Sequence, residues 1–130
     1  MEENVNALSF EHEFDLKMFK QKMPIQEIEC VYEIVSKKGY TYVGFTTNFY
    51  RRMKQHISGS NCDYIRTSIK KGLIDSFKVR IIKQSIFDKP PHHRHRLVSC
   101  NIYDETRRII EHIQRHPSKV LNNNYYLAYP

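Results

Sequence analysis

The sequence has no long apolar run and few cysteines, and both shortages narrow the class of protein. No apolar stretch approaches the roughly 20 residues that a helix needs to span a bilayer. Its three cysteines, Cys30, Cys62 and Cys100, are widely spaced, odd in number and without a CxxC pair. This pattern predicts neither a disulfide framework nor a zinc site, and it favours reduced thiols. No internal repeat or interdomain linker is present either.

The composition of the N-terminal residues also argues against a targeting peptide. The stretch MEENVNALSFEHEF is acidic and polar, which is typical of neither a signal peptide nor a basic transit peptide. Together with the reduced thiols, this predicts an intracellular, soluble protein. The pattern does not distinguish nucleus from cytoplasm.

What the sequence does contain is an excess of positive charge. It holds 21 Lys and Arg against 14 Asp and Glu, a formal net charge of +7 in 130 residues. A protein with such a positive charge favours a polyanion as its partner, because basic side chains displace the counterions condensed on nucleic acid. The charge alone leaves this open, since many basic proteins bind no nucleic acid.

Residue patterns predict the order strand, strand, helix, helix, strand, helix. Residues 28–36 and 40–46 are rich in β-branched and aromatic types, and Gly39 between them favours a tight turn. Thr47-Asn48 offers an N-cap for a helix in which Phe49, Met53 and Ile57 recur at helical spacing. Three further segments complete the order: a short helix over 63–71, an alternating strand over 76–84, and a long helix over 99–115.

These elements predict an α+β fold, a small three-stranded antiparallel sheet flanked by helices. We expect the domain to span residues 25–130. Residues 1–24 form an N-terminal extension whose segment from Phe10 to Met23 is predicted to be an amphipathic helix, because Phe14, Met18 and Phe19 recur at helical spacing. That helix is expected to pack on the domain or on a partner.

Several polar residues fall where they could meet. If even residues pair with even residues in the hairpin, Tyr32 and Tyr42 project from one side of the sheet. Arg52 and His56 are one helical turn apart, beside the buried stripe of their helix. Glu105 lies within the inward stripe of the last helix, where a carboxylate needs a partner, a metal or an altered pKa.

With these residues the sequence resembles the GIY-YIG nuclease superfamily. The resemblance is carried by Cys30-Val31-Tyr32, Tyr42-Val43-Gly44, the helix NFYRRMKQH, and a later glutamate and asparagine. It covers roughly residues 27–124. Cys30 stands where the family name has glycine, and valine replaces isoleucine in both tripeptides.

The resemblance implies roles for six residues. Tyr32 matches the proposed general base, and Tyr42 the tyrosine that orients the water or holds a phosphate oxygen. Arg52 matches the arginine that stabilises the phosphate, and His56 a histidine for phosphate contact or proton transfer. Glu105 matches the metal ligand, with a salt bridge to Arg108 or Arg52 as its alternative. The terminal asparagine that steadies the site matches Asn122, or Asn124 as the competing choice.

The resemblance also implies the reaction. We expect a metal-dependent endonuclease that uses Mg²⁺, for which Mn²⁺ can substitute, and hydrolyses DNA phosphodiester bonds. Each active site would cut one strand and leave 3′-hydroxyl and 5′-phosphate ends. Site-specific and structure-specific substrates remain equally open, as does the pathway.

Further residues are candidates for nucleic-acid contact. Gly44 would let the backbone approach closely, as strand glycines often do. The basic pairs Lys70-Lys71 and Lys78-Arg80 suit a phosphate-binding surface, although solvated charge is the default for each. The cluster His93, Arg94 and Arg96 suits a loop that contacts the DNA backbone better than a metal site.

Two rival functions belong to other classes. A non-catalytic basic module could grip branched or single-stranded nucleic acid, because tyrosines interleaved with basic residues also suit base stacking. Alternatively, the chain could be an interaction protein whose N-terminal helix recruits a partner nuclease. The same helix could also mediate a homodimer or bind another partner protein. Glu105 distinguishes the first rival from a nuclease, because a mere binder gains nothing from a carboxylate aimed at the phosphate.

Overall fold

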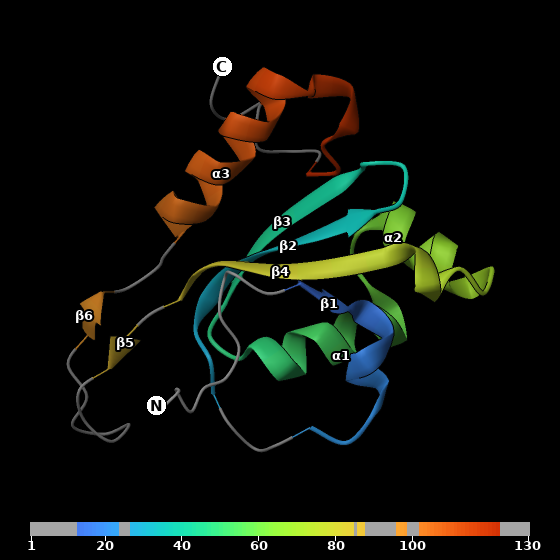
Figure 1. Ribbon diagram of the computed structural model, residues 1–130, viewed down its shortest axis with the longest axis horizontal. Coiled ribbons are helices and arrows are strands. Elements are labelled where there is room, and N and C mark those ends of the chain that lie inside the picture. Colours follow the sequence, from blue (N-terminus) through green and yellow to red (C-terminus); the bar gives the residue numbers. More distant parts are fainter. Residues whose placement is uncertain (1–12, 24–26, 85, 88–95, 99–101, 123–130) are drawn as a thin grey trace.

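A four-stranded antiparallel sheet forms the centre of the protein, with the strand order β1-β4-β2-β3 (Figure 1). The computed structural model describes residues 13–23, 27–84, 86–87, 96–98 and 102–122. The strands of this sheet are β1 (Glu13–Asp15), β2 (Cys30–Ser36), β3 (Thr41–Thr46) and β4 (Phe77–Gln84). The short strands β5 (Ile86–Phe87) and β6 (Arg96–Val98) pair separately. The predicted α+β fold is confirmed, with four strands in the main sheet instead of three.

The β2–β3 hairpin sets the register of the candidate site. Gly39 adopts a φ of 88°, and its N–H donates to the Ser36 carbonyl at 2.9 Å. In the resulting register Tyr32 faces Gly44, while Ile34 faces Tyr42. Even residues therefore pair with even residues, as predicted, and both motif tyrosines lie on one face of the sheet.

That face is covered by η1 (Leu16–Lys20), α1 (Phe49–Gly59) and α2 (Asp63–Lys70). The Asn48 side chain caps α1 by accepting from the Arg51 N–H at 3.2 Å. The largest cluster of buried side chains lies between these helices and the sheet. Its members include Phe19, Tyr32, Ile34, Phe49, Met53, Ile65, Val79 and Ile81.

The opposite face is covered in part by α3 (Ile102–Arg115). Ile109 of α3 packs against Val31 and Val43 in a second, smaller core. The helix was predicted from residue 99, and residues 99–101 lie outside the described part. The described residues also form the short 3-10 helices η2 (Ile74–Ser76) and η4 (Pro117–Lys119). The sheet is thus a layer between two groups of helices (Figure 1).

The N-terminal segment differs from the prediction. The predicted amphipathic helix from Phe10 to Met23 is wrong for residues 13–15, which form the strand β1, while residues 16–20 form a helix of the shorter 3-10 type, η1. Residues 1–12 lie outside the described part. Leu16 and Phe19 are fully buried in the main core, so their apolar surface is used within the domain and not by a partner. The boundary at residue 24 stays a prediction.

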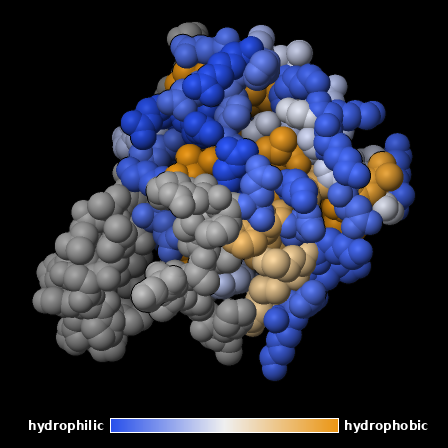
Figure 2. Space-filling model, viewed as in Figure 1, coloured by the Kyte–Doolittle hydropathy of each residue, from blue (hydrophilic) through white to orange (hydrophobic). Residues whose placement is uncertain are grey.

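Polar side chains dominate the surface on the side shown in Figure 2, where hydrophobic residues form small separate groups. Among the described residues, no helix is long and apolar enough to cross a membrane.

Candidate active site

Tyr32 lies against Gly44 at the centre of the candidate site. A Cβ atom at Gly44 would stand 2.3 Å from the Tyr32 hydroxyl oxygen and 2.4 Å from its Cζ. Only glycine therefore leaves room for the tyrosine ring across the strand pair. The space at Gly44 is filled by Tyr32, and contact of Gly44 with nucleic acid stays a prediction.

His56 connects this tyrosine to the end of α1. The Tyr32 hydroxyl lies 2.9 Å from His56 Nε2, and the Ser60 hydroxyl lies 2.7 Å from His56 Nδ1. Burial, with a smaller contribution from the charge of Arg52, lowers the pKa of His56 to about 4. The imidazole is therefore neutral near pH 7.

Tyr32 and Tyr42 differ in their access to solvent. Tyr32 has no exposed surface, whereas Tyr42 is half-buried. Burial raises the pKa of Tyr32 well above its usual value, and nearby Tyr42 raises it further. The Tyr32 ring centroid lies 6.4 Å from that of Tyr42 and 5.9 Å from that of His56. The three rings form one aromatic cluster beside α1.

Arg52 is the cation of this cluster. It is half-buried, while its neighbour Arg51 is exposed, which agrees with the expectation that Arg52 borders the buried stripe. Its guanidinium is within hydrogen-bonding reach of the Tyr32 hydroxyl, and its charge offsets part of the rise that burial causes in the pKa of both tyrosines. Arg52 also lines a groove of about 370 Å³ with Gln55, His56, Ser58, Gly59, Ser60 and Asn61.

Glu105 reaches the same site from α3. Its side chain is buried, with 8% exposure. Burial first, and then the charge of Glu105, raises the pKa of Tyr42, so the carboxylate lies close to that tyrosine. The predicted inward placement of Glu105 is therefore correct. Arg108, one of its two expected ion-pair partners, binds Glu33 and Glu111.

Asn122 joins the C-terminal segment to the middle of the second motif. Its side-chain oxygen accepts from the Val43 N–H at 2.9 Å, and its amide donates to the Val43 carbonyl at 2.7 Å. The chain before it bonds to the same strand, since the Leu121 N–H donates to the Thr41 carbonyl at 2.8 Å. Asn122 thus fixes the strand segment between Tyr42 and Gly44. Asn124 lies outside the described residues.

Two residues that the sequence patterns did not single out belong to the surroundings of the site. Ser60 is 3% exposed and follows His56 by one helical turn, a spacing that could have suggested their contact. Glu33 is 2% exposed on β2 and binds Arg108 and His112 of α3. The feature of the sequence that could have identified Glu33 is a single carboxylate within an otherwise apolar strand.

The donors that the structure places together near Glu105 are its own carboxylate and the Tyr42 phenol oxygen. Among the described residues, no group of three or more His, Cys, Asp or Glu side chains is arranged to hold a metal. A carboxylate beside a phenol oxygen is instead suited to Mg²⁺, which commonly takes one or two protein carboxylates, several waters and substrate phosphate oxygens. Glu105 would hold such an ion.

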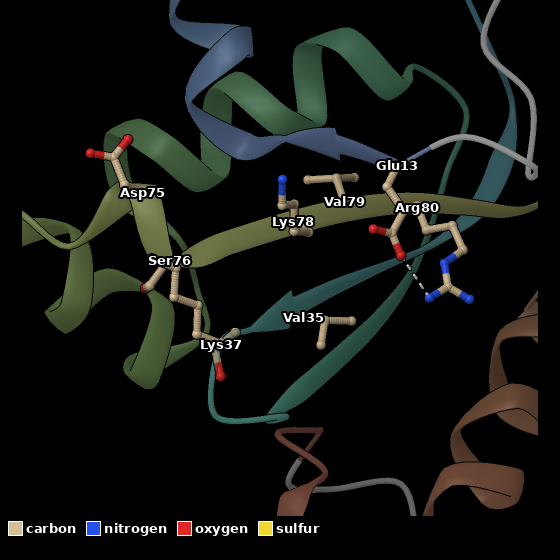
Figure 3. A pocket seen from close by; sticks show the side chains of 9 residues that line it. Glu13, Val35, Lys37, Asp75, Ser76, Lys78, Val79 and Arg80 are labelled. Carbon is tan, nitrogen blue, oxygen red and sulfur yellow. Dashed lines mark hydrogen bonds and ion pairs between the residues drawn. The ribbon is translucent and has the colours of Figure 1, made fainter.

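The expected DNA-contact residues of β4 lie elsewhere. Lys78 and Arg80 project from the face of the sheet opposite the tyrosines, along a groove of about 230 Å³ (Figure 3). Each faces an acidic residue across the strand pair. Lys78 bonds to Asp15 at 2.7 Å, and Arg80 bonds to Glu13 at 3.1 Å. These pairs neutralise much of the local positive charge.

Of the other basic residues predicted to contact DNA, some lie in the described part of the chain and others lie outside it. Lys70 and Lys71 are exposed at the end of α2, on the side of the sheet that carries the tyrosines. His93 and Arg94 lie outside the described residues. Arg96 begins β6, whose backbone pairs with β5.

Comparison with known proteins agrees with this geometry. Residues 28–89 match the family model of the GIY-YIG catalytic domain. The matched segment contains Tyr32, Tyr42, Gly44, Arg52 and His56, and it ends before Glu105. No curated protein and no solved structure matches the chain. The matched segment begins just before β2 and ends at residue 89, and both of its tyrosines contact α1 through His56. The match therefore supports the assignment of residues 28–89 to the GIY-YIG nuclease superfamily.

Proposed function

We propose that this protein is a metal-dependent endonuclease that hydrolyses DNA phosphodiester bonds. Each site cuts one strand and leaves a 3′-hydroxyl and a 5′-phosphate. The observation that carries this proposal is the hydrogen bond of 2.9 Å between the buried Tyr32 hydroxyl and His56 Nε2, beside the cation Arg52. A neutral histidine next to a tyrosine supplies a proton acceptor, and Arg52 supplies charge for a phosphate.

The proton would leave the attacking water through Tyr32. The Tyr32 oxygen accepts the water proton as its own proton moves to His56 Nε2. Resting His56 is a weak base, with a pKa of about 4, partly because of the charge on Arg52. A phosphate anion bound to Arg52 would offset that charge, so substrate binding itself would make His56 a better proton acceptor.

Arg52 would also control access to Tyr32. It is within hydrogen-bonding reach of the Tyr32 hydroxyl and also lines the groove at the end of α1. On turning toward a phosphate it would uncover the hydroxyl for water and place its charge where negative charge develops. Tyr42, which is half-buried beside Glu105, would orient the water or a phosphate oxygen.

Glu105 would hold a single Mg²⁺ or Mn²⁺ ion. When bound, this ion would neutralise charge on the leaving oxygen. The protein's own contribution is to keep a buried carboxylate close to Tyr42. Asn122 would support this arrangement by fixing Val43 at the edge of the sheet.

The test is cleavage of labelled plasmid, duplex, single-stranded, flap and four-way-junction DNA with Mg²⁺, Mn²⁺ or EDTA. Glu105→Ala should abolish metal-dependent cutting while the protein remains folded. Glu111→Ala, a more exposed carboxylate on the same helix, is the matched control and should retain activity. The preferred DNA in the panel would narrow the substrate class.

Two other outcomes would overturn the proposal. Binding of DNA without cutting of any substrate in either metal would identify a binding module. Equal activity of the native protein and Glu105→Ala would exclude the proposed metal ligand.

A further inference from the structure

Both ring nitrogens of His56 are held by hydroxyl groups. Tyr32 lies 2.9 Å from Nε2, and Ser60 lies 2.7 Å from Nδ1. Because a hydroxyl can donate or accept, neither contact alone decides which nitrogen carries the proton. The ring is neutral near pH 7, so it carries only one such proton. The choice of tautomer decides whether Nε2 can receive a proton from Tyr32.

Ser60 is fixed by other contacts. Its hydroxyl oxygen accepts from the Cys62 N–H at 3.1 Å. Its carbonyl oxygen accepts from the Arg66 guanidinium at 3.0 Å. Ser60 directly follows α1, so these bonds hold its side chain one helical turn from His56. The Nδ1 partner therefore has a defined position.

The two tautomers differ in which hydroxyl proton is not donated to His56 and needs another acceptor. With the proton on Nδ1, the imidazole donates to Ser60 and accepts from Tyr32. The spare proton then belongs to Ser60, which lines the groove at the end of α1 and can meet water there. With the proton on Nε2, the spare proton would belong to the Tyr32 hydroxyl, which is fully buried and faces the donor-only guanidinium of Arg52.

The Nδ1–H tautomer therefore satisfies more of the buried groups, since an unmet buried donor costs about 1–3 kcal/mol. We propose that Ser60 is a positioning residue that holds His56 in this tautomer and keeps Nε2 as the acceptor for the Tyr32 proton. The effect of Ser60 on cleavage rests on the proposed endonuclease function, whereas the tautomer of His56 does not depend on that function.

The direct test is long-range ¹H–¹⁵N NMR of the histidine side chains in the full chain at pH 7. In the native protein, His56 should show a protonated Nδ1 and an unprotonated Nε2. Ser60→Ala should shift His56 toward the Nε2–H form, while Ser60→Thr, which keeps the hydroxyl, should preserve the native pattern. Ser58→Ala, an exposed serine in the same turn, is the control.

Cleavage kinetics give the second readout. Ser60→Ala should lower kcat on the order of tenfold to a hundredfold with little change in KM, and Ser60→Thr should restore most of it. The kcat–pH profile of Ser60→Ala should also move. A merely structural serine would lower stability without a change in tautomer.

The two claims can fail separately. A native spectrum with the proton on Nε2, or an unchanged tautomer in Ser60→Ala, would overturn the role of Ser60. The native spectrum decides this even if Ser60→Ala does not fold. If the tautomer is as proposed but no DNA is cut, the endonuclease proposal fails while the assignment of Ser60 stands.

Discussion

Glu33 of β2 accepts a hydrogen bond of 2.8 Å from Arg108 Nε of α3, and the carboxylate is almost completely buried. His112, one turn further along α3, binds the same carboxylate. The hydrogen bonds and charges of His112 and Arg108 hold the pKa of Glu33 below its usual value, against the opposing effect of burial. This cluster ties the helix that carries Glu105 to the strand that carries Tyr32.

We predict that Glu33→Gln lowers the free energy of unfolding by about 3 kcal/mol, since it removes the buried anion and leaves Arg108 with only the more exposed Glu111 as its partner. Glu111→Gln removes the other, more exposed acidic partner of Arg108 and should cost less than about 1 kcal/mol. Urea unfolding measures both. Equal losses would show that the buried pair adds nothing beyond a surface ion pair.

The close contact between Gly44 and Tyr32 gives a second prediction. Gly44→Ala would place a methyl group 2.3 Å from the Tyr32 hydroxyl oxygen, so the tyrosine ring must move. Such overpacking costs about 1–3 kcal/mol and should separate Tyr32 from His56, with a large loss of cleavage. Thermal unfolding and single-turnover cleavage measure the two effects.

Gly59→Ala is the matched control for that substitution. A Cβ at Gly59 meets nothing within 4 Å among the described residues, and it lies at the end of α1. Stability should stay the same or rise slightly, because alanine favours a helix more than glycine does. A similar loss in both variants would show that the Tyr32 contact is not the cause.

Much of this site follows from local sequence patterns. The Gly39 turn fixes the hairpin register, and that register alone places Tyr32 and Tyr42 on one face. Helical spacing places Arg52 and His56 beside the buried stripe of α1. Such features depend on neighbours a few residues apart, which is why the order of residues along the chain predicts them.

Features that depend on distant partners were not predicted. Three residues of β1 are too few to show a strand pattern, and the strand exists because Phe14 faces Val79 while the flanking charges pair across the strands. The partners of Glu33 are likewise on α3, more than 70 residues away in sequence. The spacing of Met18 and Phe19 correctly indicates a segment with one buried side, but tertiary pairing overrides the predicted α-helix.

The buried His56 predicts a change of stability with pH. Its pKa falls from an ordinary value of about 6.5 to about 4 on folding, so the unfolded chain binds the proton more readily. This stability is fully present above about pH 6.5 and is lost as the pH falls toward 4. The loss attributable to His56 should reach about 3 kcal/mol.

Comparison of pH profiles isolates this effect. The free energy of unfolding of His56→Gln should fall less steeply between pH 6.5 and 4 than that of the native protein. His116→Gln, at an exposed histidine, should keep the native slope. Parallel profiles for the native protein and His56→Gln would contradict a depressed pKa at this position.

The ion pairs of β4 predict which basic residues bind DNA. Lys78 and Arg80 face Asp15 and Glu13, so bringing a phosphate to either must compete with an existing carboxylate. Lys70 and Lys71 are exposed on the side of the tyrosines, and neither forms a salt bridge with a described residue. Unpaired cations release more counterions from DNA when they bind it.

Replacement of Lys70 and Lys71 by Gln should therefore weaken DNA binding and reduce the slope of log K against log salt by about 0.9 for each DNA phosphate that the variant no longer neutralises. Replacement of Lys78 and Arg80 by Gln removes the same formal charge, so it controls for net charge alone. Its slope should stay close to the native value. If the slope falls equally in both double variants, long-range charge and not a localised phosphate-binding surface governs DNA binding. The ion pairs with Glu13 and Asp15 would then have no influence on it.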